Sequence, residues 1–147
     1  MMKVFIFCIL MFLLFFSCKK EITGIENSLN QVTLLTDKIS YTNLDSINLN
    51  IENKSGFDMV IGFRCGVYLE MFYQKEENKV WSDNLFFWYM SLHCPTFLDT
   101  IQANSTFTHS IPSEIFESTG TFRFLVPYYL PRKDTNMVLI SNSFEVR

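Results

Sequence analysis

Cysteine and histidine are the residues of this chain that could do chemistry at a fixed geometry. The 147 residues include four Cys and two His. Zinc sites are typically built from closely spaced ligands such as Cys-x-x-Cys or His-x-x-His, and neither spacing occurs here. His93 and Cys94 are adjacent, so on a strand their side chains would point to opposite faces. For Cys65 and Cys94, a disulfide, two free thiols and a metal site are the three alternatives.

The N-terminal segment predicts the compartment in which these cysteines fold. Lys3 is followed by an unbroken apolar run from Val4 to Phe16, which is shorter than the roughly 20 residues that span a bilayer. This length is typical of the hydrophobic region of a secretory signal. Ser17 and Cys18 follow the run and resemble the lipobox of bacterial lipoproteins, in which a small residue precedes an acylated Cys. Plain secretion and an uncleaved anchor are the alternatives.

This resemblance implies a cell-envelope protein that is held on the membrane by lipid on Cys18. Each buried CH₂ of an acyl chain contributes about 0.8 kcal/mol, so two or more chains hold a protein on a membrane essentially permanently. We expect residues 1–17 to be the signal peptide, 18–30 a lipidated tether and 31–147 the folded domain. Since exported compartments are oxidising, we expect a disulfide between Cys65 and Cys94. Closing a loop of about 30 residues would stabilise the fold by about 3.5 kcal/mol.

The folded part depends on one strand, at residues 45–53. Ile47, Leu49 and Ile51 alternate there with polar residues, which is the period of a strand with one buried face. Further strands are expected at 32–36, 39–41, 59–63, 67–75, 80–81, 106–111, 121–126 and 137–146, with Pro127 ending the seventh of these and a single helical turn starting at Pro112. Seven to nine short strands without a long helix predict an all-β sandwich.

Two stretches carry a resemblance to a known family. Residues 39–53, from Ile39-Ser40-Tyr41 to the terminal Asn53, resemble the opening of the bacterial Ig-like domains of secreted lipoproteins. Gly120-Thr121-Phe122-Arg123-Phe124 is similar to their Gly-x-Tyr-Arg strand, although Phe122 replaces the usual Tyr, and residues 141–146 are similar to their closing strand. The resemblance implies an Ig-like antiparallel β-sandwich without catalytic residues. The intracellular proteinase inhibitor family has a related layout.

Aromatic residues are the candidates for ligand binding. Trp81 and the run Leu85–Met90 include Phe87, Trp88 and Tyr89. Aromatic rings stack on sugars and anchor protein contacts, but they also fill the space between two sheets. Six consecutive large apolar residues cannot all point inward from one strand, so we expect about half of them to face elsewhere.

Composition and motifs exclude several functional classes. The formal net charge is −3 with no basic stripe, so nucleic acid is not an expected partner. The chain contains no Gly-x-Ser-x-Gly or His-Glu-x-x-His motif, and we expect neither an enzyme nor a cofactor. The sequence therefore predicts a non-catalytic envelope lipoprotein whose Ig-like domain has a binding or structural role; its ligand is unknown, and an envelope protein and a glycan are the candidates. The alternative is a protease-inhibitor-like module that presents an inter-strand loop.

Overall fold

The strand predicted at residues 45–53 is β3 (Ser46–Asn53), and it is the centre of the smaller of two sheets. The computed structural model describes residues 31–147, so the predicted signal peptide, Cys18 and the tether lie outside the described residues. Ile47, Leu49 and Ile51 are fully buried, as their alternation predicts. Burying side chains of this size contributes about 1.5–3 kcal/mol each.

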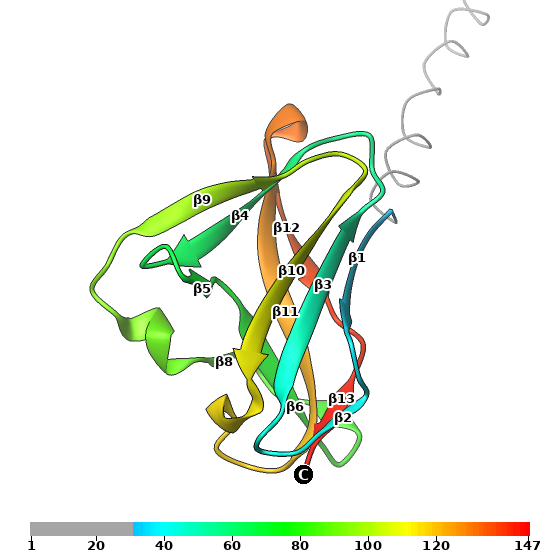
Figure 1. The fold of residues 1–147 in the computed structure, drawn as a ribbon, viewed down its shortest axis with the longest axis vertical. Helices are drawn as coiled ribbons and strands as arrows, with labels where there is room; N and C mark the ends of the chain where they lie inside the picture. The colour runs from blue at the N-terminus through cyan, green and yellow to red at the C-terminus, as the bar shows by residue number, and fades with distance from the viewer. Residues whose placement is uncertain (1–30) are drawn as a thin grey trace, which may run out of the picture. The chain divides into compact units, whose positions relative to one another are not determined.

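The smaller sheet has the strand order β1-β3-β10, and both pairings are antiparallel. Its outer strands are β1 (Val32–Thr36) and β10 (Ser105–Pro112). β10 pairs with β3 along its whole length, and it is an edge strand because β3 is its only ladder partner among the described residues. Figure 1 shows the three strands side by side on the near face of the domain.

The larger sheet is centred on β11 (Gly120–Leu130), the longest strand of the described chain. β13 and β12 pair with two successive stretches along one side of β11. β6 and β4 pair with two successive stretches along its other side. β9 pairs with β4, and β2 pairs with β13 in parallel. The remaining strands are β2 (Ser40–Tyr41), β4 (Met59–Arg64), β5 (Tyr68–Leu69), β6 (Phe72–Glu77), β7 (Val80–Trp81), β8 (Leu85–Phe86), β9 (Thr96–Ile101), β12 (Thr135–Ile140) and β13 (Phe144–Val146).

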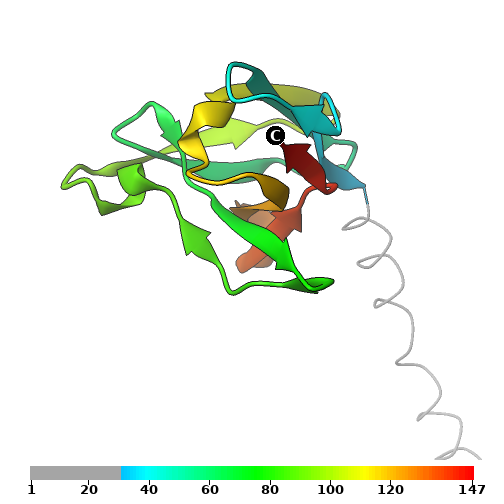
Figure 2. The same cartoon turned by 90° about the horizontal axis from the view of Figure 1, so that it is seen from below.

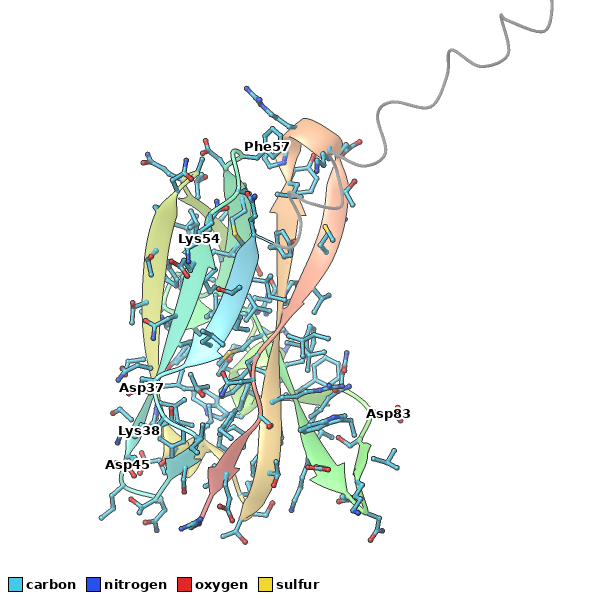
Figure 3. The ribbon with its side chains drawn as sticks, turned by 90° about the vertical axis from the view of Figure 1, so that its right-hand side faces the viewer. Asp37, Lys38, Asp45, Lys54, Phe57 and Asp83 are labelled. Carbon is cyan, nitrogen blue, oxygen red and sulfur yellow. A yellow bond between two sulfur atoms is a disulfide. The ribbon has the colours of Figure 1, made fainter. Side chains whose placement is uncertain are left out.

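The two sheets form an all-β, Ig-like sandwich, which confirms the predicted fold class. Nine of the strands in residues 31–147 have three or more residues, and the other four have two. Figure 3 shows the layers edge-on, with Asp37, Lys38 and Asp45 on the outside of the smaller sheet. Aromatic rings fill the space at the lower end of the sandwich, where Phe116 contacts Phe122 at 4.5 Å and Phe124 contacts Phe144 at 4.7 Å between centroids. Both members of each pair are buried.

Pro127 does not end its strand, and that prediction was wrong. β11 continues to Leu130, and Pro127 pairs with Val138 of β12. On the opposite side, the ladder with β6 ends at Leu125 and the ladder with β4 begins at Tyr128. Proline lacks a backbone N–H, and it is tolerated in a sheet where no ladder hydrogen bond needs that donor. The proline therefore lies in the gap between two neighbours of the same strand.

The strand predicted at 67–75 is split into β5 and β6. Between them, the N–H of Glu70 donates to the carbonyl oxygen of Gly62 at 2.8 Å. β5 pairs with β4, whereas β6 pairs with β11. The chain therefore changes its neighbour at Glu70 and Met71, which a periodicity analysis of one segment does not detect.

Three one-turn 3₁₀ helices connect strands in the described part of the chain. They are η1 (Trp88–Ser91), η2 (Ser113–Ile115) and η3 (Pro131–Lys133), and η2 lies where the sequence predicts a single helical turn. No helix within residues 31–147 is long and apolar enough to cross a membrane.

Candidate functional site

Cys65 and Cys94 are joined by a disulfide, as predicted, with 5.2 Å between their Cα atoms. The bond lies directly beyond the pair formed by Arg64 of β4 and Thr96 of β9. The N–H of Cys65 also donates to the carbonyl oxygen of Pro95 at 3.0 Å. The disulfide therefore joins the two ends of residues 66–93, which we call the inserted segment. Within this segment β6 belongs to the larger sheet, where it pairs with β11, and Figure 2 shows other green parts of the chain extending to one side of the layers.

The free-thiol and metal alternatives for this pair do not hold in the structure, because both sulfur atoms are used in the bond. Within residues 31–147, no group of three or more His, Cys, Asp or Glu side chains could hold a metal ion. His109 lies on β10, and its ring stacks on Phe107 with 6.4 Å between centroids.

The structure separates the four aromatic candidates. Phe87 is 3% exposed and does not line the cavity described below, which corrects its assignment as a ligand-binding aromatic. Tyr89 is 1% exposed, so it belongs to the core, and it reaches that cavity only as part of its wall. Trp88 lies between them and is 58% exposed. The expectation that part of the apolar run faces elsewhere is confirmed by Trp88 and by Phe86, which is also exposed.

Trp81 is separate from this group and lies on the hairpin formed by β6 and β7. The guanidinium carbon of Arg123 lies 4.3 Å from the centroid of the indole ring. Nε of Arg123 donates to Oε1 of Gln74 at 2.7 Å, which holds the cation over the ring. Trp81 does not line the cavity described next. Its ring is instead covered by the guanidinium group of Arg123.

A cavity of about 810 Å³ lies between the inserted segment and the end of β10. One wall is formed by Tyr68, Leu69 and Trp88, together with the edge of Tyr89. The other wall is formed by β10 from His109 onward and by the η2 region, which contributes Ile111, Pro112, Glu114, Ile115 and Glu117. This volume is within the range of small-molecule and peptide side-chain pockets.

The aromatic wall is a stack of rings held by the core. Tyr68 stacks on Tyr89 at 4.9 Å with an interplanar angle of 10°, and it meets Trp88 edge-on at 5.4 Å. The hydroxyl of Tyr89 donates to the carbonyl oxygen of Leu69 at 3.0 Å. Since the rings are fixed by each other and by this hydrogen bond, the wall is formed before any ligand binds.

The charges that line the cavity are negative. Glu114 and Glu117 are exposed at its rim, and its lining includes no Lys or Arg. Burial lowers the pKa of His109, which disfavours its charged form. Burial, with a smaller contribution from Glu117, raises the pKa of Tyr73. The cavity therefore favours a neutral or cationic ligand.

Most residues of this site could not be predicted from the sequence. Tyr68, Ile111, Glu114 and Glu117 come from segments more than forty positions apart, and no local motif joins them. One signal was available: residues 105–112 form a strand without a single Lys, Arg, Asp or Glu. Edge strands are usually protected by charge, so an uncharged strand predicts either a central position or a covered edge.

No family model matches the chain, and none of the curated proteins compared with it matches either. The site is therefore defined by its geometry.

Proposed function

We propose that this chain is a lipid-anchored protein of the bacterial cell envelope whose Ig-like domain is a non-catalytic binding module. Acyl chains on Cys18 hold it on the membrane, residues 18–30 are the tether, and the domain binds an envelope protein or a glycan in the cavity beside β10. The proposal includes no catalytic residue and no cofactor.

The observation that carries the proposal is the preformed cavity of about 810 Å³ with an exposed Trp88 at its edge. Tryptophan and tyrosine are the residues most enriched at binding hot spots and on sugar-stacking surfaces. An exposed Trp that is fixed by neighbouring rings loses little conformational entropy when a ligand covers it. The disulfide supports the exported location, because such bonds persist in oxidising compartments.

The position of the cavity also supports the proposal. Val32 and Ser105 both pair with Asn53, so the chain enters the domain at the Ser105 end of β10. The cavity is at the opposite end, near Pro112. Ser105 and Pro112 are seven residue steps apart along the strand, which is about 23 Å. A domain held by its N-terminal end would therefore present the cavity away from its point of attachment.

The binding claim is tested with the full chain, purified in detergent and used to retain components of a solubilised envelope fraction. We expect Trp88→Ala to lose the retained ligand. Val80→Ala is the matched control, since Val80 is 67% exposed on β7 and does not line the cavity. Equal retention by both variants and by the unmodified chain would contradict the assignment of the cavity.

The anchor is tested separately by growing the producing cells with radiolabelled palmitate. We expect the label to enter the unmodified chain and not the Cys18→Ala variant, and we expect that variant to leave the membrane fraction. Failure of the unmodified chain to take the label would contradict the proposed lipid anchor. The protease-inhibitor alternative stays a prediction of the sequence, and inhibition of an exported protease at a near-stoichiometric ratio is the result that would support it.

A further inference from the structure

Two hydrogen bonds determine which backbone groups of β10 face its free edge. The N–H of Lys54 donates to the carbonyl oxygen of Gln31 at 2.9 Å, in the register of the β1–β3 ladder. Hydrogen-bonded residues alternate along an antiparallel strand, so even-numbered residues of β3 bond to β1 and odd-numbered residues bond to β10. The N–H of Ser113 donates to the carbonyl oxygen of Asp45 at 2.9 Å and agrees with this parity. The N–H and C=O groups that face the free edge are therefore those of Thr106, Thr108 and Ser110.

This edge lacks the devices that usually protect an edge strand. Charged side chains, bulges and short length prevent edges from pairing with other chains. β10 has eight residues and none of them is Lys, Arg, Asp or Glu. Pro112 removes a donor only at the last position. In Figure 1, β9 and β10 leave their connection at the top in different directions, and β9 pairs with β4 and not with β10.

A trough runs along the inner side of the same edge. A second cavity of about 480 Å³ is lined by Phe63, Phe97 and Phe107, among others. It shares His109 with the cavity of about 810 Å³, so the two meet at this residue. Together they follow β10 from Phe107 to Ile111 and continue past η2. The apolar side chains in both linings could contact alternate side chains of an extended chain, which would project into the trough every second residue.

The charge of the trough restricts what that chain contains. Asp99 lines the smaller cavity, and Glu114 and Glu117 line the larger one. Neither lining includes Lys or Arg. Complementary charge at an interface increases the association rate and excludes partners of the wrong sign. The trough therefore selects a basic segment.

We infer that β10 binds an extended, basic segment of a partner protein, which adds to the smaller sheet as a fourth strand. The inference deepens the proposed function and rests on it, because it names the ligand class of the same cavity. The backbone of the segment exchanges hydrogen bonds with Thr106, Thr108 and Ser110. Apolar side chains at alternate positions enter the trough, and Lys or Arg side chains reach Glu114 and Glu117.

The experiment selects peptides from a random dodecapeptide phage library on the immobilised full chain at neutral pH. We expect the enriched peptides to carry net positive charge and alternating apolar residues. The absence of any enriched peptide, or enrichment of acidic peptides, would overturn the inference.

A pair of substitutions tests whether strand pairing is responsible for binding. Ser110→Pro removes one edge-facing N–H without touching the bonds to β3, and we expect it to weaken binding of the selected peptides at least tenfold, or about 1.4 kcal/mol. Ser110→Ala keeps the N–H and loses only the side-chain hydroxyl, so the loss in Ser110→Pro beyond that in Ser110→Ala measures the backbone donor. Equal binding by both variants would contradict the inference.

Two further measurements do not depend on the folding of the proline variant. N-methylation of alternate backbone nitrogens in a selected peptide removes its donors but keeps its charge, and we expect at least tenfold weaker binding in one of the two alternating frames. Glu114→Gln with Glu117→Gln should weaken binding about fivefold at low salt, whereas Glu76→Gln with Glu77→Gln on the β6–β7 hairpin should not. Binding that is indifferent to N-methylation in both frames would overturn strand addition.

The outcomes separate this inference from the proposed function. If no peptide binds and a glycan is retained in a Trp88-dependent manner, the strand inference fails and the binding module stands. If palmitate does not enter the chain, the lipid anchor fails whatever the peptides do.

Discussion

The hydroxyl of Tyr41 donates a hydrogen bond to Oδ1 of Asp37, with 2.7 Å between the oxygen atoms. The same hydroxyl accepts the N–H of Lys38 at 2.8 Å, and Oδ1 of Asp37 accepts the N–H of Asn48 at 2.9 Å. Tyr41 is fully buried and the pair joins the end of β1, β2 and β3. Since β1 and β3 belong to the smaller sheet and β2 to the larger one, this contact links the two sheets.

Removal of this hydroxyl tests how much the link contributes. We expect Tyr41→Phe to lower the free energy of unfolding by about 1–3 kcal/mol, because it leaves the N–H of Lys38 without this acceptor and removes one of the hydrogen bonds to Asp37. Tyr129→Phe is the matched control, since its hydroxyl donates to Asp134 at an exposed site, and we expect a change within about 0.5 kcal/mol. Urea unfolding of both variants measures the difference, and equal losses would contradict a special role for Tyr41.

The same pair predicts how stability depends on pH. Partial burial opposes ionisation of Asp37, but hydrogen bonds from Tyr41 and Asn48 outweigh it and lower its pKa. Its contribution is therefore complete above the unfolded value of about 3.9 and is lost as the pH falls through the lower folded value. Burial and the hydrogen bond to Asp37 raise the pKa of Tyr41 to about 12. Its contribution is complete below about pH 10 and is lost as the pH rises toward the folded value.

Urea unfolding at a series of pH values measures both limbs. We expect Tyr41→Phe to remove part of the alkaline loss and Asp37→Asn to remove part of the acid loss. Acid dependence will remain in Asp37→Asn, because backbone and side-chain hydrogen bonds from Thr42, together with Lys38, lower the pKa of Asp45 to about 2. An alkaline limb that is identical in Tyr41→Phe and the unmodified chain would contradict this assignment.

The disulfide is expected to stabilise the fold and to hold the inserted segment. The double variant Cys65→Ser with Cys94→Ser should lose about 3.5 kcal/mol, because the unfolded chain regains the freedom of a loop of about 30 residues. Mass spectrometry of the oxidised chain after alkylation should show no label at either cysteine. Full alkylation without a reductant would show that the bond does not form.

Truncation of two neighbouring residues of the aromatic run is expected to lower the free energy of unfolding by very different amounts. Phe87→Ala should lower the free energy of unfolding by about 3–5 kcal/mol, since it empties a buried site among other rings. Trp88→Ala should cost no more than about 1.5 kcal/mol, because it loses mainly edge-on ring contacts. Thermal and urea unfolding compare the two. A larger loss for Trp88→Ala would place this residue in the core.

Much of the fold could be predicted from local pattern. Ile47, Leu49 and Ile51 alternate strictly with polar residues because one face of β3 is buried in the core and the other is not. The disulfide followed from cysteine number and the expected compartment. These features depend on residues that are close in sequence or few in number.

The remainder depends on which strands become neighbours. Pro127 is tolerated because β11 changes partners beside it, and β5 separates from β6 because each pairs with a different strand. The cavity forms because the inserted segment folds back toward β10. Strand periodicity states which face of a segment is buried, but it does not state what covers that face or which edge stays open.

The measurement that tests the central claim most directly is residue-resolved amide hydrogen exchange of the unliganded chain, followed by NMR. The account predicts alternation along β10: the amides of Phe107, His109 and Ile111 should exchange slowly because they bond to β3, and those of Thr106, Thr108 and Ser110 should exchange quickly. Uniform protection of all six amides would mean that the edge is already covered, and it would contradict both the open trough and the added strand.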